Sequence, residues 1–203
     1  MAITPTTDRG RRKADRRDAI LRAAATRFAE RGYANVTLED LGAAVGVSGP
    51  AVYRHFTGKA GVLAAILLDA STRLLDGAER VLDDAPDGAP DAAAALRGLI
   101  AHHVDFAMAE ADVILVQDRE LEQLDPGARH DVRLLQRRYV ERWVEVLARL
   151  RPDQPESDLR MRAHAAFGLL NSTPHSARLP GRRPADATTR RLLAEMAWAA
   201  LTS

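Results

Sequence analysis

Apolar side chains recur through most of this chain at intervals of three and four residues, the spacing that places them on one face of an α-helix. In the first quarter of the chain, Ile20, Ala24 and Phe28 follow this spacing and predict a helix over residues 15–31. Gly32 comes directly after it, and glycine is common just beyond a helix C-terminus. The pattern therefore predicts an amphipathic helix that ends at Arg31.

Two short helices are predicted next. Thr37 is followed three residues later by an aspartate, which is a helix-start pattern, and the helix that begins there ends at Gly46. Ser48 then stands at a capping position, and Pro50 suits the first turn of a third helix over residues 49–56. Two short helices joined by a tight glycine turn, with a longer helix before them, form a helix-turn-helix arrangement.

The rest of the chain is predicted to be helical, with breaks that contain proline. Helices are predicted over residues 59–84, 91–110, 111–124, 126–150, 156–171 and 185–201. The breaks fall at residues 85–90, 125–126, 152–155 and 173–184. About nine helices, 38 alanines and only 4% aromatic residues together predict an all-α fold.

Composition excludes several classes of protein. The chain has no cysteine, which excludes disulfides, thiolate zinc sites and cysteine nucleophiles. No glycine-rich phosphate loop, HExxH or GxSxG motif is present, so we expect neither an enzyme nor a bound metal or cofactor. The longest apolar run, residues 62–68, is far shorter than the roughly 20 residues of a membrane span. The polar, basic N-terminus does not resemble a secretory signal, so we expect a cytoplasmic protein with no membrane partner.

The formal net charge of +1 hides an uneven distribution. Residues 1–59 hold eleven basic and six acidic residues, a net charge of +5, whereas residues 60–203 hold 18 basic and 22 acidic residues, a net charge of −4. A solvated basic tail would explain part of this difference. Together with the helix-turn-helix pattern, however, the basic first quarter favours binding to a polyanion.

Residues 25–59 carry a family signature. It includes the sequence AVGVS at residues 44–48, VYRHF at residues 52–56, and Lys59. These residues resemble the DNA-binding signature of the TetR family of bacterial repressors. The chain departs from the family at Ala60, where an acidic residue is usual after the lysine.

The resemblance implies a homodimeric regulator with a nine-helix fold. It places a helix-turn-helix DNA-binding domain at residues 15–60 and a ligand-binding and dimerisation domain at residues 61–203, and the basic residues 1–14 would form an N-terminal arm. The partners implied are a double-stranded DNA operator and a small-molecule effector of unknown identity. An architectural DNA-binding protein without an effector is the alternative.

Four residues are candidates for contacts with DNA phosphates. The hydroxyl of Thr37 and the amides at the start of its helix suit a phosphate. Tyr53, His55 and Lys59 resemble the other backbone contacts of the family, although Tyr53 and His55 could instead be boundary residues with their apolar bodies turned inward. Lys59 is one of only two lysines, and a cation at a helix start opposes the helix dipole, so we expect no structural gain from it.

Base and groove contacts are expected from the exposed side of the third helix. The candidates there are Ser48, Gly49, Ala51 and Arg54. Arg54 can donate two hydrogen bonds to guanine or can hold a phosphate, whereas Gly49 could let the backbone approach the DNA. The N-terminal arm is expected to follow a minor groove through Arg9, Arg11, Arg12, Lys13, Arg16 and Arg17.

The C-terminal domain is expected to enclose an apolar pocket with a few polar groups. Its candidate residues are His103, Phe106, Val113, Gln117, Tyr139, Trp143, Phe167, Leu170 and Asn171, each of which could instead be ordinary core. Residues 113–120 and 136–144 loosely resemble actinobacterial members of the family that respond to acyl-CoA thioesters. An apolar tunnel with arginines at its mouth would fit such a ligand, and a drug-like apolar inducer fits nearly as well. Arg138 is a further polar candidate for the pocket.

The two C-terminal helices are the candidate dimer interface. The predicted helices over residues 156–171 and 185–201 combine alanines with larger apolar residues, among them Leu159, Leu192 and Met196. This composition suits close packing across a two-fold axis, which would present two recognition helices to the DNA.

Overall fold

Nine α-helices and two short 3-10 helices form the part of the chain that the structure, a computed structural model, describes: residues 8–83, 91–172 and 186–203. No strand occurs in these residues, and the all-α prediction is confirmed. The elements are α1 (Asp8–Arg31), η1 (Tyr33–Asn35), α2 (Leu38–Ala44), α3 (Gly49–Val52), α4 (Lys59–Asp83), α5 (Ala92–Ala109), α6 (Ala111–Glu120), η2 (Leu121–Gln123), α7 (Pro126–Leu150), α8 (Glu156–Leu170) and α10 (Asp186–Thr202).

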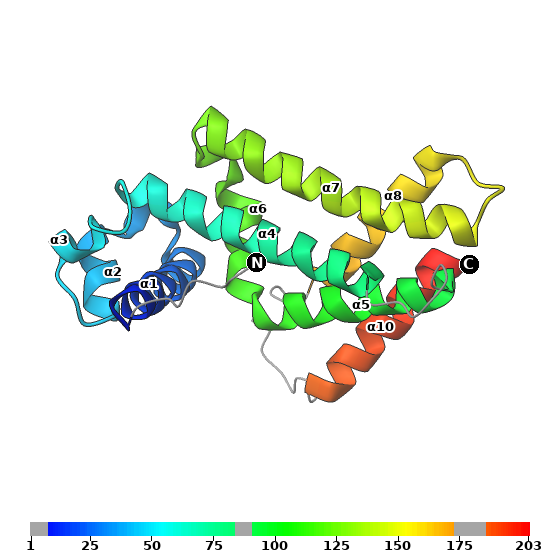
Figure 1. The fold of residues 1–203 in the computed structure, drawn as a ribbon, viewed down its shortest axis with the longest axis horizontal. Helices are drawn as coiled ribbons and strands as arrows, with labels where there is room; N and C mark the ends of the chain where they lie inside the picture. The colour runs from blue at the N-terminus through cyan, green and yellow to red at the C-terminus, as the bar shows by residue number, and fades with distance from the viewer. Residues whose placement is uncertain (1–7, 84–90, 173–185) are drawn as a thin grey trace.

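The long helix α4 joins two groups of helices. It starts beside α1, α2 and α3 at one end of the molecule and runs into a bundle with α5, α7, α8 and α10, and α7 lies alongside it (Figure 1). One buried apolar cluster includes Phe28, Leu41 and Val62 and extends to Val116 of α6. A second cluster is centred on helices of the bundle. The first cluster therefore crosses the domain boundary expected at residue 60, because α6 packs against α1.

Side-chain caps explain why several helices begin where the sequence predicts. The carboxylate of Asp91 accepts a hydrogen bond from Ala93 N at 3.1 Å, just before α5. The carboxylate of Asp125 accepts one from Ala128 N at 3.0 Å, and Pro126 occupies the first position of α7. Both caps satisfy amide groups that have no partner within the helix. The predicted bounds of α7, residues 126–150, are confirmed.

The N-terminal arm is a correction to the prediction. Helix α1 begins at Asp8, so residues 9–14 are the first turns of a 24-residue helix and not a separate arm. Arginine, alanine and lysine are good helix formers, and they dominate this stretch. Apart from alanine, residues 8–19 contain no apolar side chain, so no apolar spacing was present to reveal the helix.

Two other predicted helices end earlier than expected. Helix α3 stops at Val52, and residues 53–55 form a turn in which His55 N and Phe56 N both donate to Val52 O, at 2.9 and 3.1 Å. A segment this short cannot sustain a regular helix by itself, and Gly49 lowers its helix propensity further. The helix predicted over residues 111–124 ends at Glu120 and continues as η2.

Two predicted breaks, residues 85–90 and 173–184, lie outside the described residues. Within the described ranges, no helix combines the length and the apolar character that a membrane crossing requires.

Candidate DNA-binding surface and effector cavity

The start of α2 is fixed by a reciprocal cap. Thr37 Oγ1 accepts a hydrogen bond from Asp40 N at 3.1 Å, and the Asp40 carboxylate accepts one from Thr37 N at 2.9 Å. Hydrogen bonds from Thr37 hold the pKa of Asp40 below its usual value. The Thr37 hydroxyl also donates to this carboxylate at 2.9 Å, so it already has a partner within the helix start.

The turn between α2 and α3 depends on a close backbone approach. A Cβ atom at Gly42 would lie 2.7 Å from Val47 O, and Val47 N donates to Gly42 O at 2.9 Å. Gly46 in this turn has a φ of 69°, in the left-handed region that favours glycine. These two glycines set the path of the chain from α2 into α3.

Three of the base-contact and phosphate candidates are exposed around α3, and a fourth is partly exposed. Ser48 and Arg54 are exposed, and the Tyr53 side chain is 60% exposed, which is unusual for a tyrosine and leaves it available to a ligand. Ala51 is partly exposed. The expectation that Gly49 meets the DNA through its backbone is not supported, because Gly49 is buried and its Cα faces the Glu39 side chain.

The first turns of α1 add positive charge to this surface. Arg16 Nη1 donates to Val45 O at 3.5 Å, and the Arg17 guanidinium lies 5.4 Å from the centre of the Phe56 ring. Burial lowers the pKa of His55, and the charges of Lys13, Arg54, Arg16 and Arg17 lower it further. The cations of α1 and those after α3 therefore lie close enough to act on one imidazole.

Lys59 has a structural role that the sequence did not predict. Its ammonium group donates to Tyr33 O at 2.9 Å and to Ala34 O at 3.3 Å, and it lies 4.4 Å from the centre of the Tyr33 ring. The expectation of no structural gain was wrong, because the contacts come from η1, a segment 25 residues away in sequence. Lys59 ties the start of α4 to the turn that follows α1.

A cavity of about 220 Å³ lies in the C-terminal domain between α4, α5, α6, α7 and α8. Seven of the nine predicted pocket residues line it, namely His103, Phe106, Val113, Gln117, Tyr139, Phe167 and Asn171. The other two, Trp143 and Leu170, do not line it and are completely buried in the second apolar cluster. The prediction also missed the wall that α4 contributes through Ala70, Ser71 and Leu74.

A chain of hydrogen bonds crosses one wall of the cavity. His103 Nδ1 lies 2.9 Å from Tyr139 Oη, and His103 Nε2 lies 3.1 Å from Asn171 Oδ1. The His103 ring also stacks on Phe167, with ring centres 5.1 Å apart and planes at 5°. Burial lowers the pKa of His103 to about 4 and raises the pKa of Tyr139. Both side chains are therefore neutral at pH 7.

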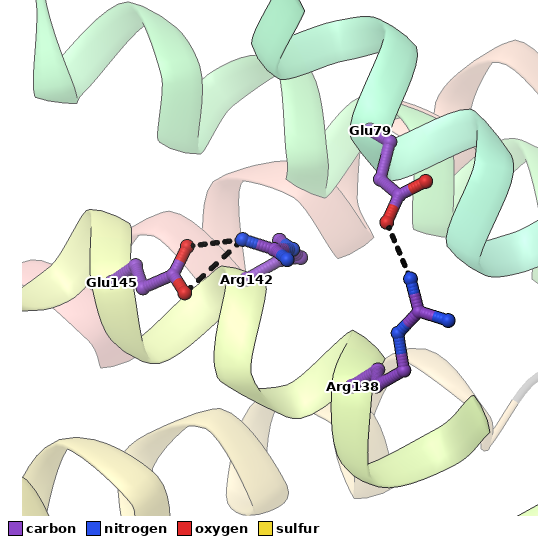
Figure 2. A network of polar contacts seen from close by, with 4 residues as sticks. All are labelled: Glu79, Arg138, Arg142 and Glu145. Carbon is purple, nitrogen blue, oxygen red and sulfur yellow. Dashed lines mark hydrogen bonds and ion pairs between the residues drawn. The ribbon is translucent and has the colours of Figure 1, made fainter. Parts of the chain in front are cut away.

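The arginines expected at the mouth of the cavity are engaged elsewhere. Arg138 does not line the cavity, and its guanidinium pairs with Glu79 of α4 at 3.2 Å (Figure 2). Arg142 pairs with Glu145, one turn further along α7, at 2.8 Å (Figure 2). The Arg138–Glu79 pair joins α7 to α4, whereas the Arg142–Glu145 pair lies within α7. Neither arginine lines the cavity, so neither adds charge to its wall.

Helix α6 contacts both the cavity and the DNA-binding domain. Its residues Val113, Ile114 and Gln117 line the cavity. On its other side, Asp112 Oδ2 accepts from Thr26 Oγ1 at 2.7 Å, Arg119 donates to Ala29 O at 3.3 Å, and Glu120 accepts from Tyr33 N at 3.2 Å. Helix α6 therefore connects the cavity to the DNA-binding domain in addition to α4, which runs from one to the other.

In the part of the chain that the structure describes, no three histidine, aspartate or glutamate side chains come together as a possible metal-ligand set. His102 and His103 point to different partners. His102 Nε2 lies 2.9 Å from Leu74 O, and the His102 ring packs directly over Gly77 of α4.

Comparison with known proteins identifies the family. Residues 20–66 match the bacterial regulatory proteins of the tetR family, and residues 89–199 match the tetracyclin repressor-like C-terminal domain. The chain belongs to the TetR family. The TetR matches cover the helix-turn-helix helices and the helices around the cavity, and this family consists of transcriptional regulators and not of enzymes.

Individual relatives agree with the TetR assignment. The HTH-type transcriptional repressor KstR2 of Mycolicibacterium smegmatis is 29% identical over 136 residues, which are 66% of this chain and 64% of that protein. The match therefore spans slightly less than two thirds of the length of this relative. The TetR regulator PfmR from Thermus thermophilus has a TM-score of 0.72 and 25% identity, with 89% of this chain and 97% of PfmR covered.

A third relative shares the fold. The structure of AibR in complex with isovaleryl coenzyme A and operator DNA has a TM-score of 0.72 and 19% identity, over 89% of this chain and 97% of AibR.

Proposed function

We propose that this chain is a ligand-responsive transcriptional repressor that binds a palindromic DNA operator as a homodimer and leaves it when a small apolar effector enters the cavity. The observation that carries the proposal is the double contact of α6, which lines the cavity on one side and hydrogen-bonds to α1 and η1 on the other. A change in the cavity that moves α6 would therefore move the helices that present α3 to DNA. Such coupling requires the effector to bind the two states with different affinity.

The basic surface around α3 supports DNA as the partner. The cations of α1 and Arg54 gather near His55, and exposed Tyr53 and Ser48 flank them. Arginine and lysine at such a surface neutralise phosphates, and an arginine on the recognition segment can read guanine. Thr37 and Lys59 would contribute phosphate contacts next to their structural hydrogen bonds, since lysine has three donor hydrogens.

Exposed apolar residues on α8 and α10 support a homodimer. Met161 of α8 is 69% exposed and Met196 of α10 is 52% exposed, and Leu192 is also exposed. Small residues on the same helices, among them Gly168 and Ala200, are exposed beside them. Large apolar side chains next to small residues suit close packing of these helices against a second copy.

Two classes of effector are compatible with the family. The apolar lining of the cavity supports a small apolar molecule. AibR, which has the same fold, binds isovaleryl coenzyme A, and this supports an acyl-CoA thioester.

The test is selection of bound sequences from a random DNA library by the purified protein, followed by footprinting of the recovered sequence. We expect a palindrome whose half-sites are separated by about one helical turn, roughly 10 base pairs, or slightly more. Recovery of DNA without a symmetric motif would favour the architectural alternative. A protein that shows no preference for duplex DNA over other polyanions would contradict the proposal.

A further inference from the structure

The cavity carries no formal charge. None of the fourteen described residues that line it is aspartate, glutamate, lysine or arginine. Its histidines are His103, which burial keeps neutral, and His164 at the exposed edge on α8. A charged group inside the cavity would therefore lose its hydration without gaining an opposite charge, and a hydrogen bond does not compensate for that loss.

Four polar atoms of the wall, from His103, Tyr139 and Asn171, are paired with one another. Asn171 Oδ1 can only accept, so His103 Nε2 donates to it and His103 Nδ1 accepts from the Tyr139 hydroxyl. Both ring nitrogens of His103 are thus used within the wall. The hydrogen bonds run from Tyr139 on α7 through His103 on α5 to Asn171 at the end of α8.

Among the described residues that line the cavity, Ser71 is the one with a fully buried polar atom that has no partner. It lines the cavity from α4, the residue is only 6% exposed, and its Oγ has no hydrogen-bond partner. A buried hydroxyl without a partner is costly, and polar atoms of this kind in a native structure usually mark a site that a ligand or water completes. Ser71 also belongs to the helix whose first residue is Lys59, so a bond made to Ser71 acts directly on the helix that joins the two domains.

We propose that the cavity binds an uncharged molecule, consisting of an apolar body with one carbonyl or hydroxyl group that hydrogen-bonds to Ser71. This inference rests on the proposed function and narrows its effector class. Ketones, alcohols, esters and lactones fit the description. Carboxylates, amines and the phosphorylated part of a coenzyme A thioester do not fit inside the cavity, because nothing there neutralises their charge.

The test uses probes of one size that differ in charge. Cyclohexanone, cyclohexanol, cyclohexanecarboxylate and cyclohexylammonium are titrated into the purified protein at pH 7.5 and followed by ligand-observed NMR, and isovaleryl coenzyme A is titrated in parallel. We expect the ketone and the alcohol to bind at least about tenfold more tightly than the two ions. We expect Ser71→Ala to weaken ketone and alcohol binding by about fivefold to tenfold, which is the loss of one hydrogen bond.

Thr72→Ala is the matched control, since Thr72 is the exposed neighbour of Ser71 on the same helix and should leave every affinity unchanged. Ser71→Ala should melt at the same temperature as the parent protein or higher, because it removes a buried hydroxyl that has no partner.

The inference is overturned if either ion binds as tightly as the ketone, or if isovaleryl coenzyme A binds more than tenfold more tightly than every neutral probe. It is also overturned if no neutral probe binds, or if Ser71→Ala leaves their affinities unchanged. DNA selection by the same protein is measured separately, so a failure here is distinguishable from a failure of the proposed function.

Discussion

Lys59 has an observed structural role and a proposed DNA-contact role, and the two act on different measurable quantities. Its ammonium group holds the carbonyls of Tyr33 and Ala34 and lies over the Tyr33 ring, and we propose that it also contacts a phosphate. The first role contributes to folding, and the second would contribute to DNA affinity and its salt dependence.

Lys59→Ala should therefore change both quantities. We expect a loss of about 1–2 kcal/mol in the free energy of unfolding, because two carbonyls lose a charged donor. We also expect weaker binding to all DNA and a salt slope smaller by about 1. Denaturant titration and DNA binding at several salt concentrations measure the two effects. Lys13→Ala, at the other, exposed lysine, should weaken DNA binding without changing stability. An unchanged salt slope in Lys59→Ala would show that its role is structural only.

Arg54 is expected to read sequence, not only charge. It is exposed directly after α3, where a guanidinium can reach a guanine edge in the major groove. Arg54→Ala should cost about 1–3 kcal/mol on the selected operator and relax the preference at one base position of each half-site. Binding-site selection with the variant measures this change. A uniform loss on all sequences would instead assign Arg54 to a phosphate.

His103 predicts a pH dependence of stability. Its pKa is about 4 in the folded protein and 6.5 ordinarily, so between these values the unfolded chain binds a proton that the folded chain does not. The contribution of His103 to stability is therefore full above pH 6.5 and is lost as the pH falls toward 4, by about 3 kcal/mol in total.

Thermal unfolding between pH 4 and pH 7.5 measures this loss. His103→Gln keeps hydrogen-bonding groups for Tyr139 and Asn171 but does not titrate, so it should flatten the pH dependence. The pKa of His55 is also lowered, so His55 adds to the loss of stability as the pH falls. The part due to His103 is therefore the difference between the parent protein and the variant. Parallel curves for the two proteins would contradict the prediction.

At the scale of elements, the approach of α2 to α3 depends on a single missing side chain. A Cβ atom at Gly42 would collide with the backbone carbonyl of Val47, which cannot rotate away as a flexible side chain could. Gly42→Ala should therefore destabilise the protein by about 1–3 kcal/mol and reduce operator affinity by displacing α3. Ala43→Ser, at the exposed neighbouring position, is the control and should change neither quantity. Unaltered melting of Gly42→Ala would show that the turn can adjust.

The apolar spacing and the capping residues predict some helix ends correctly and miss others. The bounds of α7 follow from Asp125, Pro126 and a continuous apolar spacing, and they agree with the structure. The start of α1 was predicted too late, because its first turns have no apolar face to reveal them. The end of α3 was predicted too late, since Val52 and Phe56 fit a helical spacing but are held instead by a turn.

At the scale of the whole molecule, α8 and α10 carry the exposed apolar surface that we propose as the contact with a second copy. Met196→Glu places a charge in the middle of this apolar surface and should convert the dimer into monomers, because an unpaired charge opposes burial. Operator binding should fall with it, since two half-sites are no longer bound together. Sedimentation at micromolar concentration measures the first effect and footprinting the second. Leu134→Glu, at an exposed leucine on α7, should remain dimeric.

Two helices connect the cavity to the DNA-binding domain in the proposed mechanism. Helix α4 contributes Ser71 to the cavity and Lys59 to the contact with η1. Helix α6 contributes Val113 to the cavity and Asp112 to the contact with α1. An effector that repacks the cavity would act on both helices at once. The spacing of two recognition segments in a dimer is the quantity that such a movement would change.

The sequence by itself determined the helical fold, the family signature and seven of the residues around the cavity. These follow from local spacing, capping and composition, which any segment carries without its neighbours. Only the tertiary structure decided that Lys59 hydrogen-bonds to η1, that Trp143 belongs to the core and that the Ser71 hydroxyl faces the cavity without a partner. Each of these depends on atoms that come from segments distant in the chain, and the spacing within one helix contains no information about which of them will meet.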